Sequence, residues 1–156
     1  MLLTLTFLTA LGAGLMAGLF FAFSAVIMKA LARLPPEQGM RAMQSINVTI
    51  LRPSFLGVFL GTAVASLVLG GLAVHSWEER GAPYLLLGSA LYLLGVIGVT
   101  FAFNVPRNEA LEAVDPASAE APRLWARYVS GWTAWNHVRT VSALGATASF
   151  ILVLWR

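Results

Sequence analysis

The stretch LLTLTFLTALGAGLMAGLFFAFSAVIM, residues 2–28, decides the fold because it contains no charged residue. The hydrocarbon core of a bilayer is about 30 Å thick, and roughly 20 helical residues cross it. The stretch has no positively charged start, and its apolar run is much longer than that of a secretory signal. We therefore expect a retained membrane-spanning helix at this position.

The rest of the chain has the same apolar character. Of its 156 residues, 58% are hydrophobic and 11% are charged, whereas a soluble domain carries roughly 25% charged residues. This composition excludes a water-soluble monomer. Three more segments can cross a bilayer, at about 53–75, 83–103 and 131–155, and the last brings Arg139 into or near the membrane. We predict an all-α membrane four-helix bundle, a single transmembrane domain over residues 1–156.

The distribution of Lys and Arg predicts the orientation. Most of these residues lie in the loops after the first and third predicted spans, and basic loops face the cytoplasm. We therefore expect an integral membrane protein, in a bacterial inner membrane, with both termini outside the cytoplasm. Start signals at Pro36 and Pro116 predict short cytoplasmic-side helices in these two loops, near 36–51 and 122–130.

The residue content narrows the chemistry. The chain has no cysteine, which excludes disulfides and thiol catalysis. We assign the net charge of +3 to headgroup contacts rather than to nucleic acid. The two histidines, His75 and His137, fall at opposite membrane ends, so we expect no metal site. Gly-x-x-x-Gly spacings that begin at Gly14 and Gly57 allow helix packing within the chain or a homo-oligomer.

An aromatic helix face leads into the last span and ends at an arginine. Its members recur at helical steps of three or four residues: Trp125, Tyr128, Trp132, Trp135 and Arg139. Asn136 is adjacent on that face, and His137 is rotated about 100° further round. An arginine at membrane depth is costly and usually has a partner. Three roles stay open for Arg139: reaching the headgroups, structural hydrogen bonding, or binding a ligand.

Further polar side chains are expected at the same membrane face. Asn104 and Asn108 follow the third span, and Gln44 and Asn47 lie on the short helix after the first. Together with Arg139, these amides predict an aromatic-walled pocket with neutral hydrogen-bonding groups and one fixed cation. Such a pocket suits a flat, apolar, weakly acidic molecule.

Motifs spread in order over nearly the whole chain resemble the anthrone oxygenase-like family of small four-helix membrane proteins. They are Gly18-Leu19-Phe20-Phe21-Ala22-Phe23-Ser24, Met43-Gln44-Ser45-Ile46-Asn47, Asn104-Val105-Pro106-Arg107-Asn108-Glu109-Ala110-Leu111 and Trp135-Asn136-His137-Val138-Arg139-Thr140. The resemblance implies oxygenation of anthrones to anthraquinones, a reaction thought to need no metal or organic cofactor.

We therefore expect a cofactor-independent oxygenase that acts on a small lipophilic aromatic molecule such as an anthrone. Arg139 and Asn136 would stabilise its enolate, and His137, although off the main face, would be the general base. Membrane lipid would surround the protein. The expected substrate contacts are Trp132, Trp135, Asn47, Gln44, Asn104 and Asn108. The alternatives are a non-catalytic membrane protein that binds a quinone-like molecule, a lipid or a partner protein, and a small transporter.

Overall fold

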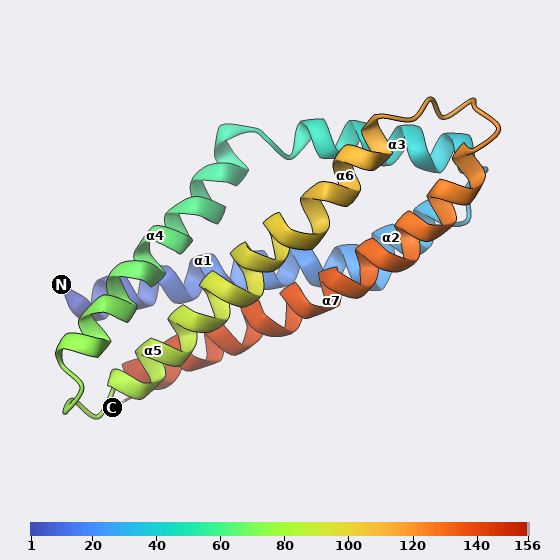
Figure 1. The fold of residues 1–156 in the computed structure, drawn as a ribbon. Coiled ribbons are helices and arrows are strands. Elements are labelled where there is room, and N and C mark those ends of the chain that lie inside the picture. The colour runs from blue at the N-terminus through green and yellow to red at the C-terminus, as the bar shows by residue number, and fades with distance from the viewer. Residues whose placement is uncertain (156) are drawn as a thin grey trace.

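The computed structural model describes residues 1–155, and its regular structure is entirely helical within that range (Figure 1). Four helices are long and apolar enough to cross a membrane: Leu2–Leu31, Pro53–His75, Ala82–Glu112 and Ala121–Leu154. The structure confirms the predicted all-α fold with four spans. By length and composition, the chain is an integral membrane protein.

Two of the four spans contain wider π-helical turns, which are rare and often occur at functional sites. The first span consists of α1 (Leu2–Ala22), η1 (Phe23–Ile27) and α2 (Met28–Leu31). The third consists of α5 (Ala82–Ala90), η2 (Leu91–Gly98), η3 (Thr100–Asn104) and α6 (Val105–Glu112). The remaining helices are α3 (Pro36–Thr49), α4 (Pro53–His75) and α7 (Ala121–Leu154).

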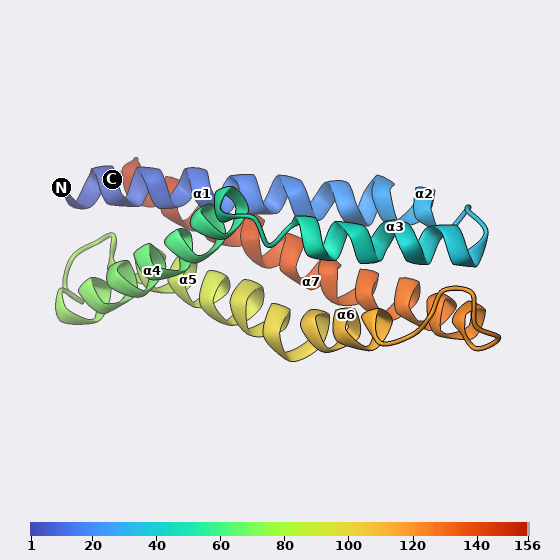
Figure 2. The same cartoon turned by 90° about the horizontal axis from the view of Figure 1, so that it is seen from above.

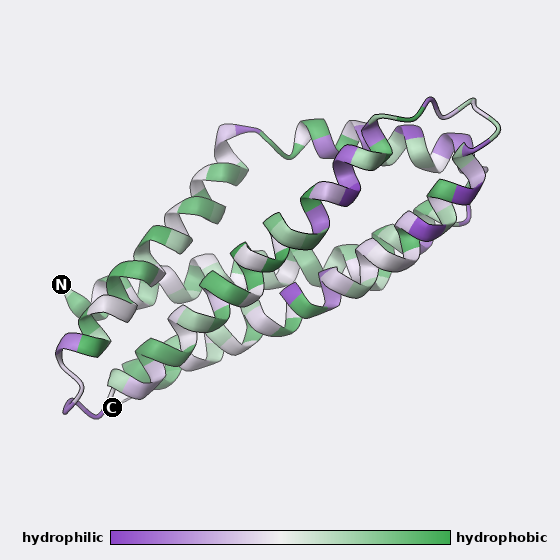
Figure 3. Cartoon of the chain, viewed as in Figure 1, coloured by the Kyte–Doolittle hydropathy of each residue, from purple (hydrophilic) through white to green (hydrophobic). Residues whose placement is uncertain are grey.

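The bundle has two distinct ends. Both termini and the α4–α5 turn lie at one end, which we call the terminal end (Figures 1 and 2). Helix α3, the end of α6 and the α6–α7 loop lie at the other, which we call the α3 end. Hydrophilic residues gather at the α3 end and at the α4–α5 turn (Figure 3), with the apolar layer between them. Which end faces the cytoplasm stays a prediction from the basic residues.

Helix α7 is longer than the span predicted at 131–155. It has 34 residues and is therefore about 50 Å long. The short helix expected near 122–130 and the last span form one continuous helix. Pro122 does not interrupt it because proline is tolerated in the first helical turn. The added turns extend α7 beyond the apolar layer and bury Trp125 and Tyr128 at the α3 end.

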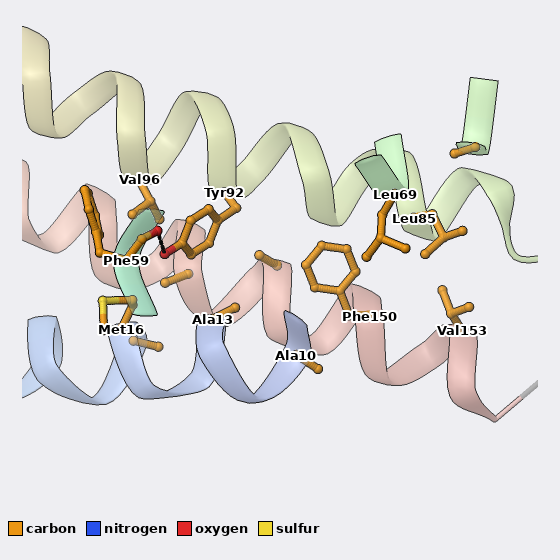
Figure 4. Packing of buried hydrophobic residues seen from close by; sticks show 14 of the residues in the cluster. Ala10, Ala13, Met16, Phe59, Leu69, Leu85, Tyr92, Val96, Phe150 and Val153 are labelled. Atoms are coloured by element: carbon orange, nitrogen blue, oxygen red, sulfur yellow. Dashed lines mark hydrogen bonds between the residues drawn. The ribbon is translucent and has the colours of Figure 1, made fainter. Parts of the chain in front are cut away.

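Two apolar clusters form the interior. The main core lies toward the terminal end and includes Phe59, Leu69, Tyr92 and Phe150 (Figure 4). Its buried phenol is satisfied, because the Tyr92 hydroxyl donates to the Phe59 carbonyl oxygen at 3.1 Å. The second core, at the α3 end, consists of Phe23, Met28, Met40, Met43, Leu111, Ala121, Trp125, Tyr128 and Trp132.

Helix α3 is fastened across the α3 end. A Cβ atom at Gly39 would lie 2.8 Å from the backbone oxygen of Leu31, so α3 can approach α2 this closely only with glycine there. The Gln44 side-chain nitrogen donates to the carbonyl oxygens of Leu111 at 3.0 Å and Val114 at 3.3 Å. These bonds tie α3 to the end of α6, and α3 therefore closes this end of the bundle.

The glycines of the Gly-x-x-x-Gly spacings differ in their surroundings. A Cβ atom at Gly14 would meet Thr147 of α7 at 3.6 Å, whereas one at Gly18, Gly57 or Gly61 would meet nothing within 4 Å. Of these four glycines, Gly14 is therefore the one that closely approaches another helix within residues 1–155. A homo-oligomer through the remaining glycines stays a prediction.

Candidate functional site

A cavity of about 160 Å³ lies where the two cores meet. Phe20 and Phe59 of the main core line it, and so do Phe23, Met43 and Trp132 of the second core. Its walls come from α1, η1, α3, α4, η3, α6 and α7 and are mainly apolar and aromatic. The polar residues of the lining are Asn47, Thr100, Asn104, Asn108 and Arg139.

Arg139 brings the one charge into this lining, and it is only 6% exposed. Its Nη2 atom donates to Asn136 Oδ1 at 2.6 Å, and its Nη1 atom donates to Thr100 Oγ1 at 3.3 Å. The guanidinium carbon lies 4.4 Å from the centre of the Phe20 ring and 5.0 Å from that of Trp132. Neutral groups and ring faces therefore hold the cation.

The surroundings of Arg139 reduce the roles that its sequence position leaves open. The side chain lies inside the bundle, so it does not reach out to the headgroups. No Asp or Glu among residues 1–155 forms a salt bridge with it. A buried charge without a counter-charge is unfavourable by several kcal/mol in typical proteins. The cavity therefore favours a bound group that carries negative charge.

Asn136 holds Arg139 in place from behind. It is fully buried, and its Nδ2 atom donates to the Phe20 carbonyl oxygen at 2.7 Å and to Ser24 Oγ at 2.6 Å. Its Oδ1 atom accepts the short bond from Arg139. Asn136 itself does not line the cavity. It is therefore a positioning residue that joins α1 and η1 to the guanidinium on α7.

Several side chains of the lining carry polar atoms without partners. Three of these atoms, each buried and without a hydrogen bond among residues 1–155, are Asn104 Oδ1, Trp132 Nε1 and Arg139 Nε. All three belong to residues that line the cavity. Buried polar groups are normally paired, because an unpaired one costs about 1–3 kcal/mol. Two of these atoms, Trp132 Nε1 and Arg139 Nε, are N–H donors, for which an oxygen atom is the suitable acceptor.

The structure brings together predicted site residues from distant parts of the sequence. Those that line the cavity are Asn47, Asn104, Asn108, Trp132 and Arg139. They come from α3, η3, α6 and α7. Two of the asparagines also bind neighbouring groups: Asn104 Nδ2 donates to the Trp132 carbonyl oxygen at 3.3 Å, and Asn108 Oδ1 accepts from the Tyr128 hydroxyl at 2.9 Å.

Three predicted site residues lie elsewhere. His137 is exposed and lines a separate hollow with Lys29, so its assignment as general base does not fit this geometry. Trp135 stacks on Phe103 with centroids 3.5 Å apart, outside the lining. Gln44 uses its amide to fasten α3. The cause for the first two is helical rotation: each neighbour of Asn136 is turned about 100° away from it.

The sequence analysis missed several groups around Arg139. Thr100 accepts one of its hydrogen bonds, Phe20 lies under its guanidinium, and Ser24 anchors Asn136. Phe20 and Ser24 belong to the first quoted motif, which was a usable signal. Nothing marked Thr100, because a threonine in an apolar span most often bonds to its own helix, as this one also does through Val96.

Metal-ligating side chains do not gather in the part of the chain that the structure describes. No group of three His, Asp or Glu residues there could hold a metal ion. His75 lies in the last turn of α4, at the terminal end, whereas His137 lies near the middle of α7. The expectation that the protein uses no metal stays a prediction.

A comparison with protein families adds an independent finding. The model of the family described as anthrone oxygenase matches residues 54–149, which is more than half of the chain. The matched range contains Asn104, Asn108, Trp132 and Arg139 of the cavity. No curated protein and no solved structure gives a significant match. The family match confirms the resemblance seen in the sequence motifs, and the chain belongs to the anthrone oxygenase family.

Proposed function

We propose that this chain is a membrane oxygenase that oxidises a flat, lipophilic, weakly acidic aromatic ketone of the anthrone type. The observation that supports this best is the Arg139 cation, which has no counter-charge among residues 1–155, in an aromatic cavity with unpaired polar atoms. Membership of the anthrone oxygenase family supports the same reaction class.

The proposed chemistry begins with the acidity of the substrate. An anthrone has a CH₂ group between two aromatic rings, opposite its ketone. Loss of one CH₂ proton spreads negative charge onto the ketone oxygen. A guanidinium in a low-dielectric cavity stabilises this oxyanion more than the neutral ketone. Arg139 would therefore accelerate the reaction by stabilising the charged form selectively.

The enolate then supplies the electrons that reduce dioxygen. Dioxygen bonds to the former CH₂ carbon and, with a proton, gives a hydroperoxide. Loss of water from this hydroperoxide leaves a second carbonyl group. In total, one anthrone and one dioxygen give one anthraquinone and one water. The Trp132 and Phe20 rings would hold the flat substrate through their faces.

The route of the proton follows from the composition of the lining. No Asp, Glu or His of the part of the chain that the structure describes lines the cavity. In this proposal the proton leaves to a water molecule, and the rate enhancement comes from Arg139 rather than from a side-chain base. The rate is then expected to rise with pH until the bound substrate is fully ionised, because only the enolate reacts.

Oxygen consumption by the purified protein in lipid nanodiscs, with an anthrone as substrate, tests this function. Anthraquinone formation is followed by absorbance, and the background rate without protein is subtracted. For Arg139→Met we expect kcat/KM to fall roughly 100-fold, about 2.7 kcal/mol. Arg107→Met is the matched control, because Arg107 donates to the Phe103 carbonyl oxygen outside the cavity lining. Equal rates with active and heat-inactivated protein would contradict the proposal.

The absence of a side-chain base from the lining also favours a second candidate, a non-catalytic protein that binds a quinone-like ligand. This candidate predicts that the protein retains anthraquinone but consumes no oxygen with any anthrone. Arg139→Met should then weaken anthraquinone binding, and neither the variant nor the unmodified protein should consume oxygen. The same nanodisc preparation therefore separates the two functions.

A further inference from the structure

We infer that the cavity is filled sideways from the bilayer, through a mouth between the α3–α4 turn and η3. The inference rests on the proposed function in that it takes the cavity to be a ligand site. It adds the phase from which the ligand comes: the acyl chains of the membrane, rather than water.

Access along the bundle axis is closed at both ends to a ligand of aromatic size. Toward the α3 end, the second core separates the cavity from the polar loops, and Met40 and Met43 in it are at most 1% exposed. Gln44 fastens α3 over this core. Toward the terminal end, the cavity is bounded by the main core, in which the buried Tyr92 bonds to Phe59. A ligand of aromatic size therefore has no straight path from either aqueous side.

The lining reveals the open side. Among the residues that line the cavity, the exposed ones are Leu51 at 63% and Phe101 at 58%. Leu51 lies in the α3–α4 turn, and Phe101 lies in η3, within the third membrane span. Both side chains are apolar, and Phe101, as an exposed apolar side chain on a membrane span, would contact acyl chains. The exposed Arg52, next to Leu51, would reach the headgroup level.

The same side of the cavity is the part that can widen. Ligand pockets usually measure about 300–1,000 Å³, so the cavity of about 160 Å³ must enlarge to hold three fused rings. The helix is broken between Thr49 and Pro53, where α4 turns away from α3 (Figure 1). Residues 53–58 of α4 are all exposed or half-buried. Few contacts therefore oppose an outward movement of the α3–α4 turn.

The chain contains no cysteine, so one introduced cysteine can be labelled specifically. We would attach a nitroxide to Leu51→Cys and to Phe101→Cys in liposomes and measure relaxation by dioxygen and by a water-soluble nickel chelate. Dioxygen concentrates among acyl chains, whereas the chelate stays in water. The mouth is expected to favour dioxygen at both positions. Stronger relaxation by the nickel chelate at both would overturn the inference.

A second experiment obstructs the mouth and measures the rate of ligand binding. Labelling Leu51→Cys with a bulky maleimide should slow anthraquinone binding roughly tenfold, about 1.4 kcal/mol in the barrier. Val48→Cys is the matched control, because Val48 is 64% exposed, lies three positions away and does not line the cavity. Equal slowing at both positions, or none at Leu51, would overturn the inference. If anthraquinone does not bind at all, the proposed ligand class fails, and the relaxation measurement still decides where the mouth opens.

Discussion

Buried polar groups are bonded differently at the terminal end of the bundle and at the cavity. Toward the terminal end, hydroxyls such as those of Thr6 and Ser149 bond to carbonyl oxygens one turn away on the same helix. Ser66 and Ser89 are exceptions without a partner. At the cavity, polar groups from different helices meet around Arg139, and several stay unpaired. The first arrangement lets polar residues pack inside a membrane protein. The second leaves polar groups whose hydrogen bonds a ligand could complete.

Phe150→Ala should give the largest change in stability, and we expect this change to be confined to the terminal end. The ring is fully buried in the main core, and loss of such a ring typically costs about 3–5 kcal/mol of unfolding free energy. Denaturant titration in nanodiscs measures this cost. The anthrone oxidation rate per folded molecule should stay unchanged. A lower rate per folded molecule would show that the terminal end and the cavity are not independent.

Asn136→Leu should impair the cavity, because Asn136 positions the Arg139 guanidinium. The variant removes the 2.6 Å bond to Arg139 and both bonds to the first span. We expect kcat/KM to fall roughly 10–100-fold, about 1.4–2.7 kcal/mol. Thr147→Val is the control, because the Thr147 hydroxyl bonds only to Ala143 of its own helix among residues 1–155. Equal rates in the two variants would remove the positioning role.

Trp135→Leu should have a smaller effect that is confined to stability. Its ring stacks on Phe103 at an interplanar angle of 4°, and such pairs contribute about 0.5–1.5 kcal/mol. Thermal denaturation should show a modest decrease, while the affinity for anthraquinone stays the same. Weaker binding of anthraquinone would return Trp135 to the substrate contacts expected from sequence.

His137→Gln should change least of all. The side chain is exposed and faces away from the cavity, so anthrone oxidation and its dependence on pH should match the unmodified protein. Initial rates of anthrone oxidation over a range of pH are the measurement. A lost or shifted pH dependence would restore His137 as the base.

Much of the fold could be predicted because the apolar layer of a membrane imposes simple rules. Uncharged stretches of about 20 residues mark spans whatever their packing, and all four were visible. Helix boundaries were less certain. The signals at residues 122–130 suit a separate helix or an extension equally well, and packing of Trp125 and Tyr128 under α3 selects the extension.

The candidate site could be predicted only in part. Asn47, Asn104 and Arg139 stood out because polar side chains are costly in lipid, and they do line one cavity. Sequence spacing could not show which neighbours of Arg139 face inward, because the π-helical turns η1 and η3 change the helical register locally. It also could not show that Gln44 is engaged by backbone carbonyls far along the chain.

The central claim is that Arg139 stabilises the anionic form of a flat aromatic molecule in the cavity. A hydroxylated anthraquinone tests it directly, because its visible absorption changes when it ionises. Its pKa is measured bound to the protein and free in empty nanodiscs. We predict that binding lowers this pKa by about one unit or more, about 1.4 kcal/mol, in the unmodified protein but not in Arg139→Met. An equal pKa in both proteins, or a raised pKa in the unmodified one, would contradict the account.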